Sequence, residues 1–276
     1  MSDGPAIDPA AATEAKQCCA RLYESDVAAL LLGDSFHPGG AALTERLGTL
    51  LALTPETHLV DAATGRGTSA LLLAQRFGCR VTGFDLSRRN VERAEQDAAA
   101  LGLSDRVSFA CGDVETLPIA NGSADAIICE CAFCTFPDKR AAARELARVL
   151  GPGGRVGLSD ITRAPGHAHE LNDLMSWIAC LADAQSADSY GAWLTGAGFT
   201  VTTIEEHDDA LRELVRTIGS RLFVTEVLAG LKKVDLPGFD FDAAKRMARQ
   251  ATVAIEQGRL GYAIVCGQLP PHLARA

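Results

Sequence analysis

The sequence of 276 residues contains no uninterrupted apolar run long enough to cross a lipid bilayer. Residues 1–5 also lack the basic segment and the following apolar segment of a secretory signal. We therefore expect a cytoplasmic protein without a membrane partner. Neither an internal repeat nor a low-complexity tract is visible, and an apolar share of 47% fits one large core or one core with an added cap.

An excess of basic residues is lacking as well. Lys and Arg number 26 against 35 Asp and Glu, which gives a net charge of −9. A negatively charged protein opposes long contact with phosphate backbones, so we expect no nucleic-acid partner. A small-molecule substrate is the partner that we expect instead.

The nine cysteines are an odd number, which does not indicate a disulfide framework in a cytoplasmic protein. Cys131 and Cys134 have the three-residue offset of a zinc site, but no second pair accompanies them. Thiols with packing or chemical roles are therefore expected. We place Cys79, Cys111 and Cys266, in or beside predicted strands, in the core.

The stretch 59–77 organises the rest of the chain. An apolar strand that contains Asp61 runs into Thr64, Gly65 and Gly67, and a helical segment follows directly. The glycines permit a sharp turn and the close approach of a ligand, to which the first amides of the helix can donate. This pattern predicts a nucleotide-like ligand. A pyrophosphate fingerprint would need a third glycine, so a nicotinamide cofactor is not indicated.

Further along the sequence, other predicted strands also have an acidic residue at their carboxyl end. Strands are predicted in the ranges 79–85, 107–114, 124–130 and 155–159, and the first three bring Asp85, Asp113 and Glu130 to their ends. An acid after the second strand suits ribose hydroxyls, and an open parallel sheet places its ligand crevice at the strand ends. The pattern therefore predicts an α/β, doubly wound domain.

This series of motifs resembles the S-adenosylmethionine-dependent methyltransferases of the Rossmann-like class over about residues 45–200. The resemblance implies S-adenosyl-L-methionine as the cofactor and a mostly parallel seven-stranded sheet flanked by helices. It also implies an N-terminal helical lid segment at 1–44, a cofactor-binding domain at 45–204, and a helical cap with the final strand at 205–276.

In that family the first turn wraps the methionine part of the cofactor, the second acid holds ribose, and the third lies beside adenine. The matching residues are Asp61, Thr64, Gly65 and Gly67, then Asp85 with Leu86, then Asp113 with Val114, and Glu130 is assigned to the same site. Ala63 stands where the family usually has its first glycine. We expect the loop to keep a negative φ there.

Several local elements follow from the pattern. Ser87 is expected to cap a helix that begins after it. Helices are also predicted from residue 15, within 166–190, and over 138–150 and 208–258, the last with a break at 235–238, and a final strand is predicted at 260–267. Gly39 and Gly40 either present their amides to the cofactor or only start the helix at 41–47.

The sequence after the fourth strand is rich in cysteine. Cys129 is expected to be buried in the strand, whereas Cys131 and Cys134 follow in a loop, where thiolates can bind a soft centre. This loop, with its ending at 137–139, and Cys180 resemble the arsenite methyltransferases. That resemblance implies that Cys131 and Cys180 hold trivalent arsenic, As(III), as metalloid ligands. The candidates for the third ligand are Cys18, Cys19 and Cys134.

Glu130 departs from that resemblance, because the arsenite methyltransferases usually have asparagine at its position. The leading hypothesis is nevertheless a methyltransferase for thiolate-bound arsenite, which can use a thiol reductant and needs no strong base. The second hypothesis is a methyltransferase for a small organic acceptor with an O, N, C or S nucleophile. An oxygen or nitrogen acceptor would more often need a base, for which His37, His167, His169 and His207 are candidates. The third is a non-catalytic metalloid sensor that binds the cofactor.

Overall fold

The computed structural model describes residues 37–165, 183–231, 233, 236 and 239–271. The helix predicted from residue 15 and most of the insertion predicted at 166–190 lie outside these residues. So do Cys18, Cys19, Cys180, His167 and His169.

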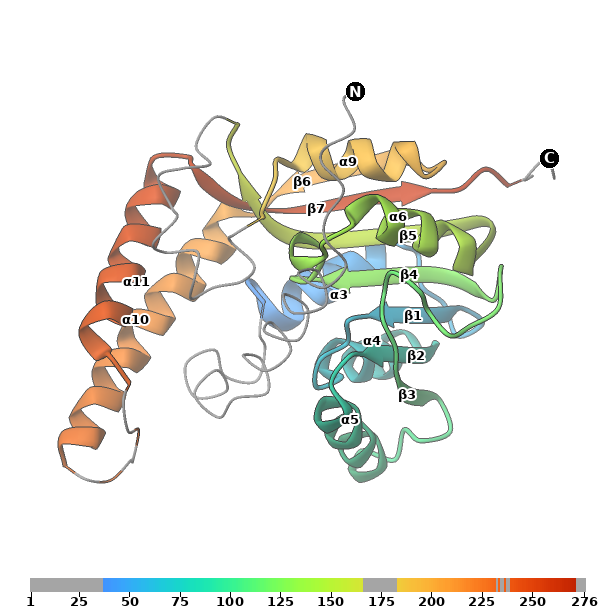
Figure 1. Ribbon diagram of the computed structural model, residues 1–276. Helices are drawn as coiled ribbons and strands as arrows, with labels where there is room; N and C mark the ends of the chain where they lie inside the picture. Colours follow the sequence, from blue (N-terminus) through green and yellow to red (C-terminus); the bar gives the residue numbers. More distant parts are fainter. Residues whose placement is uncertain (1–36, 166–182, 232, 234–235, 237–238, 272–276) are drawn as a thin grey trace.

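A single seven-stranded sheet forms the centre of the described chain (Figure 1), in the order β3-β2-β1-β4-β5-β7-β6. Strands β1 to β5 pair in parallel, and β7 is antiparallel to both of its neighbours. The predicted fold class, a mostly parallel Rossmann-like sheet flanked by helices, is therefore confirmed. The strands are β1 His58–Ala62, β2 Arg80–Asp85, β3 Val107–Cys111, β4 Ala124–Glu130, β5 Leu150–Arg163, β6 Thr200–Glu206 and β7 Leu260–Gln268.

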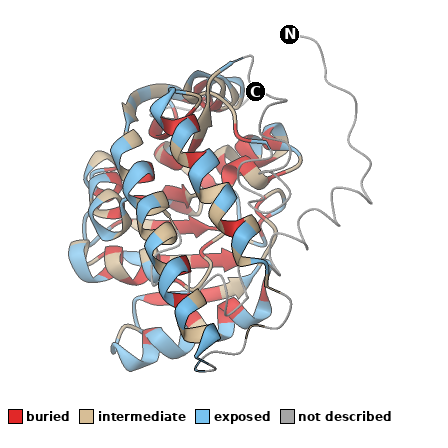
Figure 2. Cartoon of the chain, turned by 90° about the vertical axis from the view of Figure 1, so that its left-hand side faces the viewer, coloured by how far each residue is buried: buried red, intermediate tan, exposed pale blue. Residues whose placement is uncertain are grey.

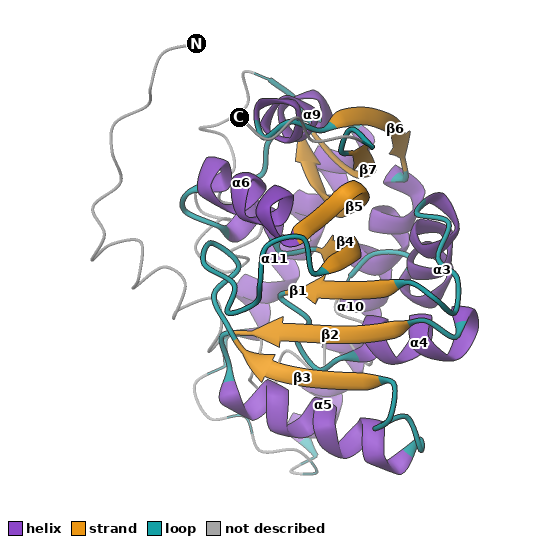
Figure 3. Cartoon of the chain, turned by 90° about the vertical axis from the view of Figure 1, so that its right-hand side faces the viewer, coloured by secondary structure: helices purple, strands orange, loops and turns teal. Residues whose placement is uncertain are grey.

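Helices cover both faces of the sheet (Figure 3), with α3, α4 and α5 on one side and α6 and α9 on the other. Their bounds are α3 Gly40–Leu50, α4 Thr68–Phe77, α5 Arg88–Ala100, α6 Lys139–Val149 and α9 Ala187–Gly196, and a short 3₁₀ turn, η1, covers Phe133–Thr135. The alternation of side chains along a strand divides the core accordingly. Ile127 packs with the α6 and α9 side, whereas the adjacent Ile128 packs with the α3 and α4 side.

The second part of the chain adds a helical hairpin that projects from one end of the sheet (Figure 1). Helices α10 Asp208–Gly230 and α11 Phe241–Glu256 pack against each other, and the break between them confirms the predicted interruption. Figure 2 shows that their outward faces are exposed while the strands behind them are buried. The chain then returns as β7, which lies inside the sheet between β5 and β6.

Helix starts follow from local hydrogen bonds. The Ser87 hydroxyl accepts a hydrogen bond from the Asn90 amide at 3.0 Å, which confirms Ser87 as the cap of α5. Asp138 caps α6 in the same way through the Ala141 amide. Gly39 starts α3 with a left-handed backbone at φ 75°.

Candidate functional site

A pocket opens at the carboxyl ends of β1, β2 and β4, next to the turn that leads into α4. It encloses about 1130 Å³ of empty space, part of it open to solvent. This is the edge at which an open parallel sheet holds its ligand. The lining residues are His37, Asp61, Ala63, Thr64, Gly65, Arg66, Thr68, Ser69, Asp85, Leu86, Asn90, Gly112, Asp113, Val114, Glu130, Cys131, Ala132, Thr135 and Phe136.

The turn after β1 has a left-handed backbone at Ala63, Gly65 and Gly67, with φ of 61°, 55° and 76°. The expectation of a negative φ at Ala63 is therefore wrong. The turn takes the same path that a glycine would take, and the alanine carries the steric cost, roughly 1–2 kcal/mol. The small Ala63 methyl group packs against the core cluster on the α6 side.

The two glycines of the turn serve different purposes. A Cβ atom on Gly67 would lie 2.6 Å from the Phe109 ring and 2.8 Å from the Ala94 methyl, so only glycine fits. A Cβ on Gly65 would meet nothing within 4 Å, which leaves its backbone angle as the local requirement. Gly65 lines the pocket, and Gly67 supports the turn from behind, where it also precedes α4.

The carboxylate of Asp85 connects the end of β2 to this turn. Its two oxygens accept hydrogen bonds from the backbone amides of Gly65 at 2.9 Å and Ser87 at 2.8 Å, and from the Asn90 side chain at 3.3 Å. Asp85 is only 8% exposed. Asp85 and Leu86 both line the pocket, as the predicted ribose contacts require, although those contacts themselves stay predictions.

The predicted adenine residues lie on the same wall. Asp113 and Val114 line the pocket after β3, and Asp113 accepts a hydrogen bond from the Glu115 amide at 3.0 Å. This hydrogen bond between residues two positions apart fixes the start of the loop between β3 and β4. The residues predicted for methionine, ribose and adenine are thus together around one pocket, apart from Gly67 behind the turn.

Asp61 is an unusual acid in this pocket, because it is 2% exposed. Burial raises its pKa to about 7, against the lowering effect of the Thr64 hydroxyl, which donates to Asp61 at 2.6 Å. The carboxylates of Glu130 and Asp85 raise it further. The pocket therefore concentrates negative charge, which suits a cationic ligand.

Glu130 is the centre of a buried polar network that the sequence did not predict. Its carboxylate accepts hydrogen bonds from the hydroxyls of Thr44 at 3.0 Å and Ser159 at 3.2 Å. The Tyr262 hydroxyl donates to Ser159 in turn at 3.1 Å. His37 Nε2 lies 3.7 Å from a Glu130 oxygen. No local pattern links these residues, because Thr44 and Glu130 are separated by 86 positions.

The loop after β4 separates the cysteines into different environments. Cys131 lines the pocket with a left-handed φ of 52°, and its amide donates to the Ser159 carbonyl at 2.7 Å. Cys134 is completely buried in the core, so the expectation of a loop thiolate that can bind a soft centre is wrong for this residue. The reason is η1, a turn in which Phe133 and Cys134 are both buried. Cys129 is buried in β4, as predicted.

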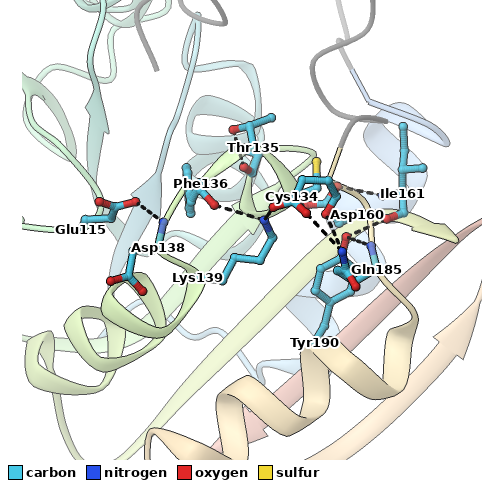
Figure 4. A network of polar contacts seen from close by, with 12 residues as sticks. Glu115, Cys134, Thr135, Phe136, Asp138, Lys139, Asp160, Ile161, Gln185 and Tyr190 are labelled. Carbon is cyan, nitrogen blue, oxygen red and sulfur yellow. Dashed lines mark hydrogen bonds and ion pairs between the residues drawn. The ribbon is translucent and has the colours of Figure 1, made fainter. Parts of the chain in front are cut away.

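Polar contacts fix η1 from behind (Figure 4). The Asp160 carboxylate accepts the Cys134 amide at 2.9 Å, and the Lys139 ammonium donates to the Phe136 carbonyl at 3.1 Å. Lys139 also pairs with Asp183. This network holds the part of the pocket wall that Thr135 and Phe136 form.

Of the three other cysteines that were predicted to lie in the core, two are buried and one is exposed. Cys79 and Cys266 are buried, as predicted, and burial raises the pKa of Cys79 to about 11 and that of Cys266 to about 12. Cys111 is exposed, so its placement in the core is wrong. It is the last residue of β3, the edge strand, and its side chain is exposed there, although Val107 and Phe109 on the same face of the strand are buried. Within the described ranges, no group of three or more His, Cys, Asp or Glu side chains could hold a metal ion.

Two of the four candidate histidines are described. His37 lines the pocket, whereas His207 precedes α10 and pairs with Glu205 at 3.4 Å, away from the pocket lining. Gly39 and Gly40 do not line the pocket, which leaves them the role of starting α3. No helix in the described part of the chain is long and apolar enough to cross a membrane.

Comparison with known proteins agrees with this geometry. A family model described as a methyltransferase domain matches residues 59–154. The chain is 31% identical to the methyltransferase GfsG of Streptomyces halstedii, over 65% of this chain and 66% of that protein. It is 30% identical to an arsenite methyltransferase of Halobacterium salinarum, over 58% of this chain but only 41% of that protein.

A third relative matches over more of its length. The chain is 27% identical to the 27-O-demethylrifamycin SV methyltransferase of Amycolatopsis mediterranei, over 83% of each protein.

Solved structures share the fold. A phosphoethanolamine N-methyltransferase of Haemonchus contortus in complex with S-adenosyl-L-methionine has a TM-score of 0.79 at 17% identity, and covers 93% of this chain and 60% of that one. A geranyl diphosphate C-methyltransferase of Streptomyces coelicolor A3(2) has a TM-score of 0.75 at 19% identity, and covers 96% of this chain and 99% of that one.

Proposed function

We propose that this chain, which belongs to the S-adenosylmethionine-dependent methyltransferases, methylates an oxygen or nitrogen atom of a small organic molecule. The observation that carries the proposal is the composition of the pocket wall at the end of β4. Among the described residues, Cys131 is the one thiol that lines the pocket, and it lies next to the carboxylate of Glu130 and in the same pocket as the His37 imidazole. A wall with these groups suits a hard oxygen or nitrogen nucleophile.

The cofactor site fits S-adenosyl-L-methionine in charge and shape. The cofactor supplies an electrophilic methyl group on a sulfonium centre. The buried carboxylates of Asp61, Asp85 and Glu130 give the pocket a negative field that favours a cation. The left-handed turn at Gly65 leaves room for close approach of the ligand to the backbone.

The chain contributes orientation and exclusion of water. Methyl transfer requires the nucleophile, the methyl carbon and the sulfur atom in line. A site that holds the two reactants in this alignment lowers the entropic part of the activation barrier. Asp85, fixed by three hydrogen bonds, is suited to hold the nucleoside end. The wall of Cys131, Ala132 and Phe136 is suited to shield the transfer end.

Arsenite is the second candidate acceptor. It is supported by the position of Cys131 in the pocket and by the similarity to the arsenite methyltransferase of Halobacterium salinarum. The ligand set would also need Cys180 and either Cys18 or Cys19, which lie outside the described residues. Burial of Cys134 removes support for it as the third ligand.

A binding protein without turnover is the third candidate. It would use the same pocket and Cys131 to sense a metalloid. Product analysis separates it from the two enzymes, because a sensor consumes no cofactor.

The test is a product assay with the full chain. The chain is incubated with S-adenosyl-L-methionine that carries a labelled methyl group and with one acceptor at a time. The acceptors are catechol, phosphoethanolamine, 27-O-demethylrifamycin SV, and arsenite with glutathione. Mass spectrometry then locates the label. We expect the label on an organic acceptor.

Two serine variants separate the candidates. Cys131→Ser is expected to keep organic methylation, and the exposed Cys111 provides the matched control Cys111→Ser. Label on arsenic alone, abolished by Cys131→Ser and retained in the control, would replace the proposal by the arsenite enzyme. Cofactor binding without any methylated product would favour the sensor.

A further inference from the structure

We propose that Lys139 is a positioning residue of the cofactor pocket, and that its buried ammonium group holds the wall that Thr135 and Phe136 form. The lysine does not line the pocket itself and acts through the backbone of Phe136. The assignment goes beyond the proposed function, because it concerns the binding of the cofactor and holds for an organic acceptor as well as for arsenite.

The ammonium group of Lys139 is in an unusual place for a lysine. The residue is only 5% exposed, and lysines are almost never fully buried unless their charge is paired. Its Nζ atom donates a hydrogen bond to the Phe136 carbonyl at 3.1 Å and pairs with the carboxylate of Asp183. It also lies over the Trp193 ring, 5.8 Å from the ring centre. An acid, a carbonyl and an aromatic ring thus surround the charge.

A gain in stability does not explain this charge. Lys139 is the first residue of α6, where the positive end of the helix dipole disfavours a cation. The side chain of Asp183 is 57% exposed, so solvent weakens its attraction to the ammonium group. The ammonium group itself bears the cost of burial, which such a pair does not offset. The consequence of the ion pair for the protein therefore lies in the loop that the ammonium group holds.

The ammonium group holds a residue that faces the cofactor pocket. Phe136 lines the pocket and is 8% exposed. Lys139 fixes its carbonyl, and its ring packs edge to face on the Phe133 ring, with 5.7 Å between the ring centres. The Phe133 ring in turn contacts the rings of Tyr190 and Trp193 on α9. The backbone and the ring of Phe136 therefore both depend on groups behind the wall.

The same network reaches the loop after β3. The Asp138 amide donates a hydrogen bond to the Glu115 carboxylate at 3.0 Å (Figure 4). The Glu115 amide donates to Asp113 at 3.0 Å, and Asp113 lines the pocket as the residue that we predict beside adenine. The loops after β3 and β4 are thus joined next to Lys139. Loss of the anchor at Phe136 would therefore affect both walls of the cofactor pocket.

Other hydrogen bonds keep the surrounding elements in place without Lys139. The Asp160 carboxylate accepts a hydrogen bond from the Cys134 amide at 2.9 Å, and Asp138 caps α6. Neither bond involves the ammonium group. Removal of the ammonium group should therefore release Phe136 locally and leave η1 and α6 folded.

Local release of the wall has a consequence for binding. A wall that is already in its binding conformation needs no ordering when the cofactor arrives. When only a fraction of the molecules has this conformation, the apparent Kd rises by the inverse of that fraction. The ammonium group of Lys139 should therefore increase the affinity for the cofactor without a matching increase in the stability of the fold.

The experiment uses two variants of the ion pair. Lys139→Met removes the charge and the donor, and leaves without its partner only the half-exposed Asp183. Asp183→Asn removes the countercharge but keeps the ammonium group as a donor to Phe136. Lys245→Met is the matched control, because Lys245 also pairs with a carboxylate but lies on α11, outside the pocket lining. Calorimetry measures the Kd for S-adenosyl-L-methionine, and urea unfolding of the full chain measures stability.

The two variants should rank in opposite order for affinity and for stability. We expect Lys139→Met to raise the cofactor Kd about tenfold or more, and Asp183→Asn to raise it less. Asp183→Asn should have the lower urea midpoint, because it leaves a buried charge without its partner. The control should keep the Kd of the wild type. An ion pair with only a structural role would lower the midpoint and leave the Kd of the folded protein unchanged, which would overturn the assignment.

Hydrogen exchange tests the wall without the cofactor and includes the wild type. In the cofactor-free wild type, the amides of residues 134–138 should already exchange slowly. In Lys139→Met they should exchange about tenfold faster, and the cofactor should restore their protection. Rapid exchange in the cofactor-free wild type would overturn the assignment, and so would equal exchange in both proteins. A wild type that binds no cofactor would overturn the cofactor pocket as well, whereas an unchanged Kd in Lys139→Met would overturn this assignment alone.

Discussion

The carboxylate of Asp85 accepts a hydrogen bond from the backbone amide of Gly65 at 2.9 Å, which joins the end of β2 to the turn after β1. The acid thus has a structural partner on the same turn that the cofactor would contact. A second oxygen binds the Ser87 amide and thereby the start of α5. One side chain therefore holds two walls of the pocket together.

Asp85→Asn should weaken cofactor binding. The amide keeps the size of the side chain but loses the charge and one acceptor oxygen, and hydrogen bonds to charged groups contribute about 1.5–3 kcal/mol each. We expect the Kd for S-adenosyl-L-methionine to rise by roughly 10–100-fold in calorimetric titration. Asp105→Asn, at an exposed position between α5 and β3, is the control and should bind like the wild type. Equal affinity in Asp85→Asn would remove Asp85 from the site.

Gly67→Ala and Gly65→Ala should differ in stability. Both place a side chain on a left-handed backbone, but only the Gly67 variant drives a Cβ into the Phe109 ring. We expect Gly65→Ala to cost about 1–2 kcal/mol in the free energy of unfolding, and Gly67→Ala about 1–3 kcal/mol more. Urea unfolding of the two variants measures the difference. Equal losses would show that the contact of Gly67 with the Phe109 ring does not contribute to the free energy of unfolding.

Ala63→Gly should raise the free energy of unfolding, whereas the two glycine-to-alanine substitutions lower it. The native φ of 61° is strained for alanine and relaxed for glycine, while glycine adds entropy to the unfolded chain. We expect a net gain of about 0.5–1 kcal/mol in the free energy of unfolding, measured by the same urea method. A loss would mean that packing of the Ala63 methyl outweighs its backbone strain.

The stability of the cofactor-free chain should fall as the pH rises toward neutrality. Burial raises the pKa of Asp61 to about 7 in the native state, so the native state binds this proton more tightly than the unfolded chain does. Its contribution is complete in acid, below the unfolded value of about 4, and disappears as the pH passes through 7. Between pH 5 and pH 8, the wild type should lose roughly 2–3 kcal/mol relative to Asp61→Asn.

Cofactor binding should show the reverse trend with pH. A cation prefers the ionised Asp61, so affinity should rise between pH 6 and pH 8, and binding should release a proton. Calorimetry in two buffers of different ionisation enthalpy detects that proton. Asp61→Asn should bind with no such release, and identical proton release in the variant would assign the titration to another group.

The acids at the strand ends could be predicted from sequence, because parallel strands bring their carboxyl ends to one edge of the sheet. Asp61 lies one residue before the end of an apolar strand, Asp85 ends one and Asp113 follows one, and all three line the pocket. The backbone at Ala63 could not be predicted from residue type, because the path of the whole turn overrides the preference of one alanine.

Contacts between residues far apart in the sequence could not be predicted from local sequence patterns. The bond between Thr44 and Glu130 spans 86 positions and depends on α3 lying against the end of β4. The burial of Cys134 depends on the 3₁₀ turn, and Cys111 is exposed because it lies at the very end of β3, after the buried Val107 and Phe109. Each of these facts follows from tertiary structure, which the spacing of residues does not encode.

The most direct measurement follows the labelled methyl group of S-adenosyl-L-methionine in the presence of the full chain and each acceptor in turn. We expect the label to appear on the oxygen or nitrogen of an organic acceptor. Label found only on arsenic, or cofactor binding with no label on any acceptor, would contradict the account.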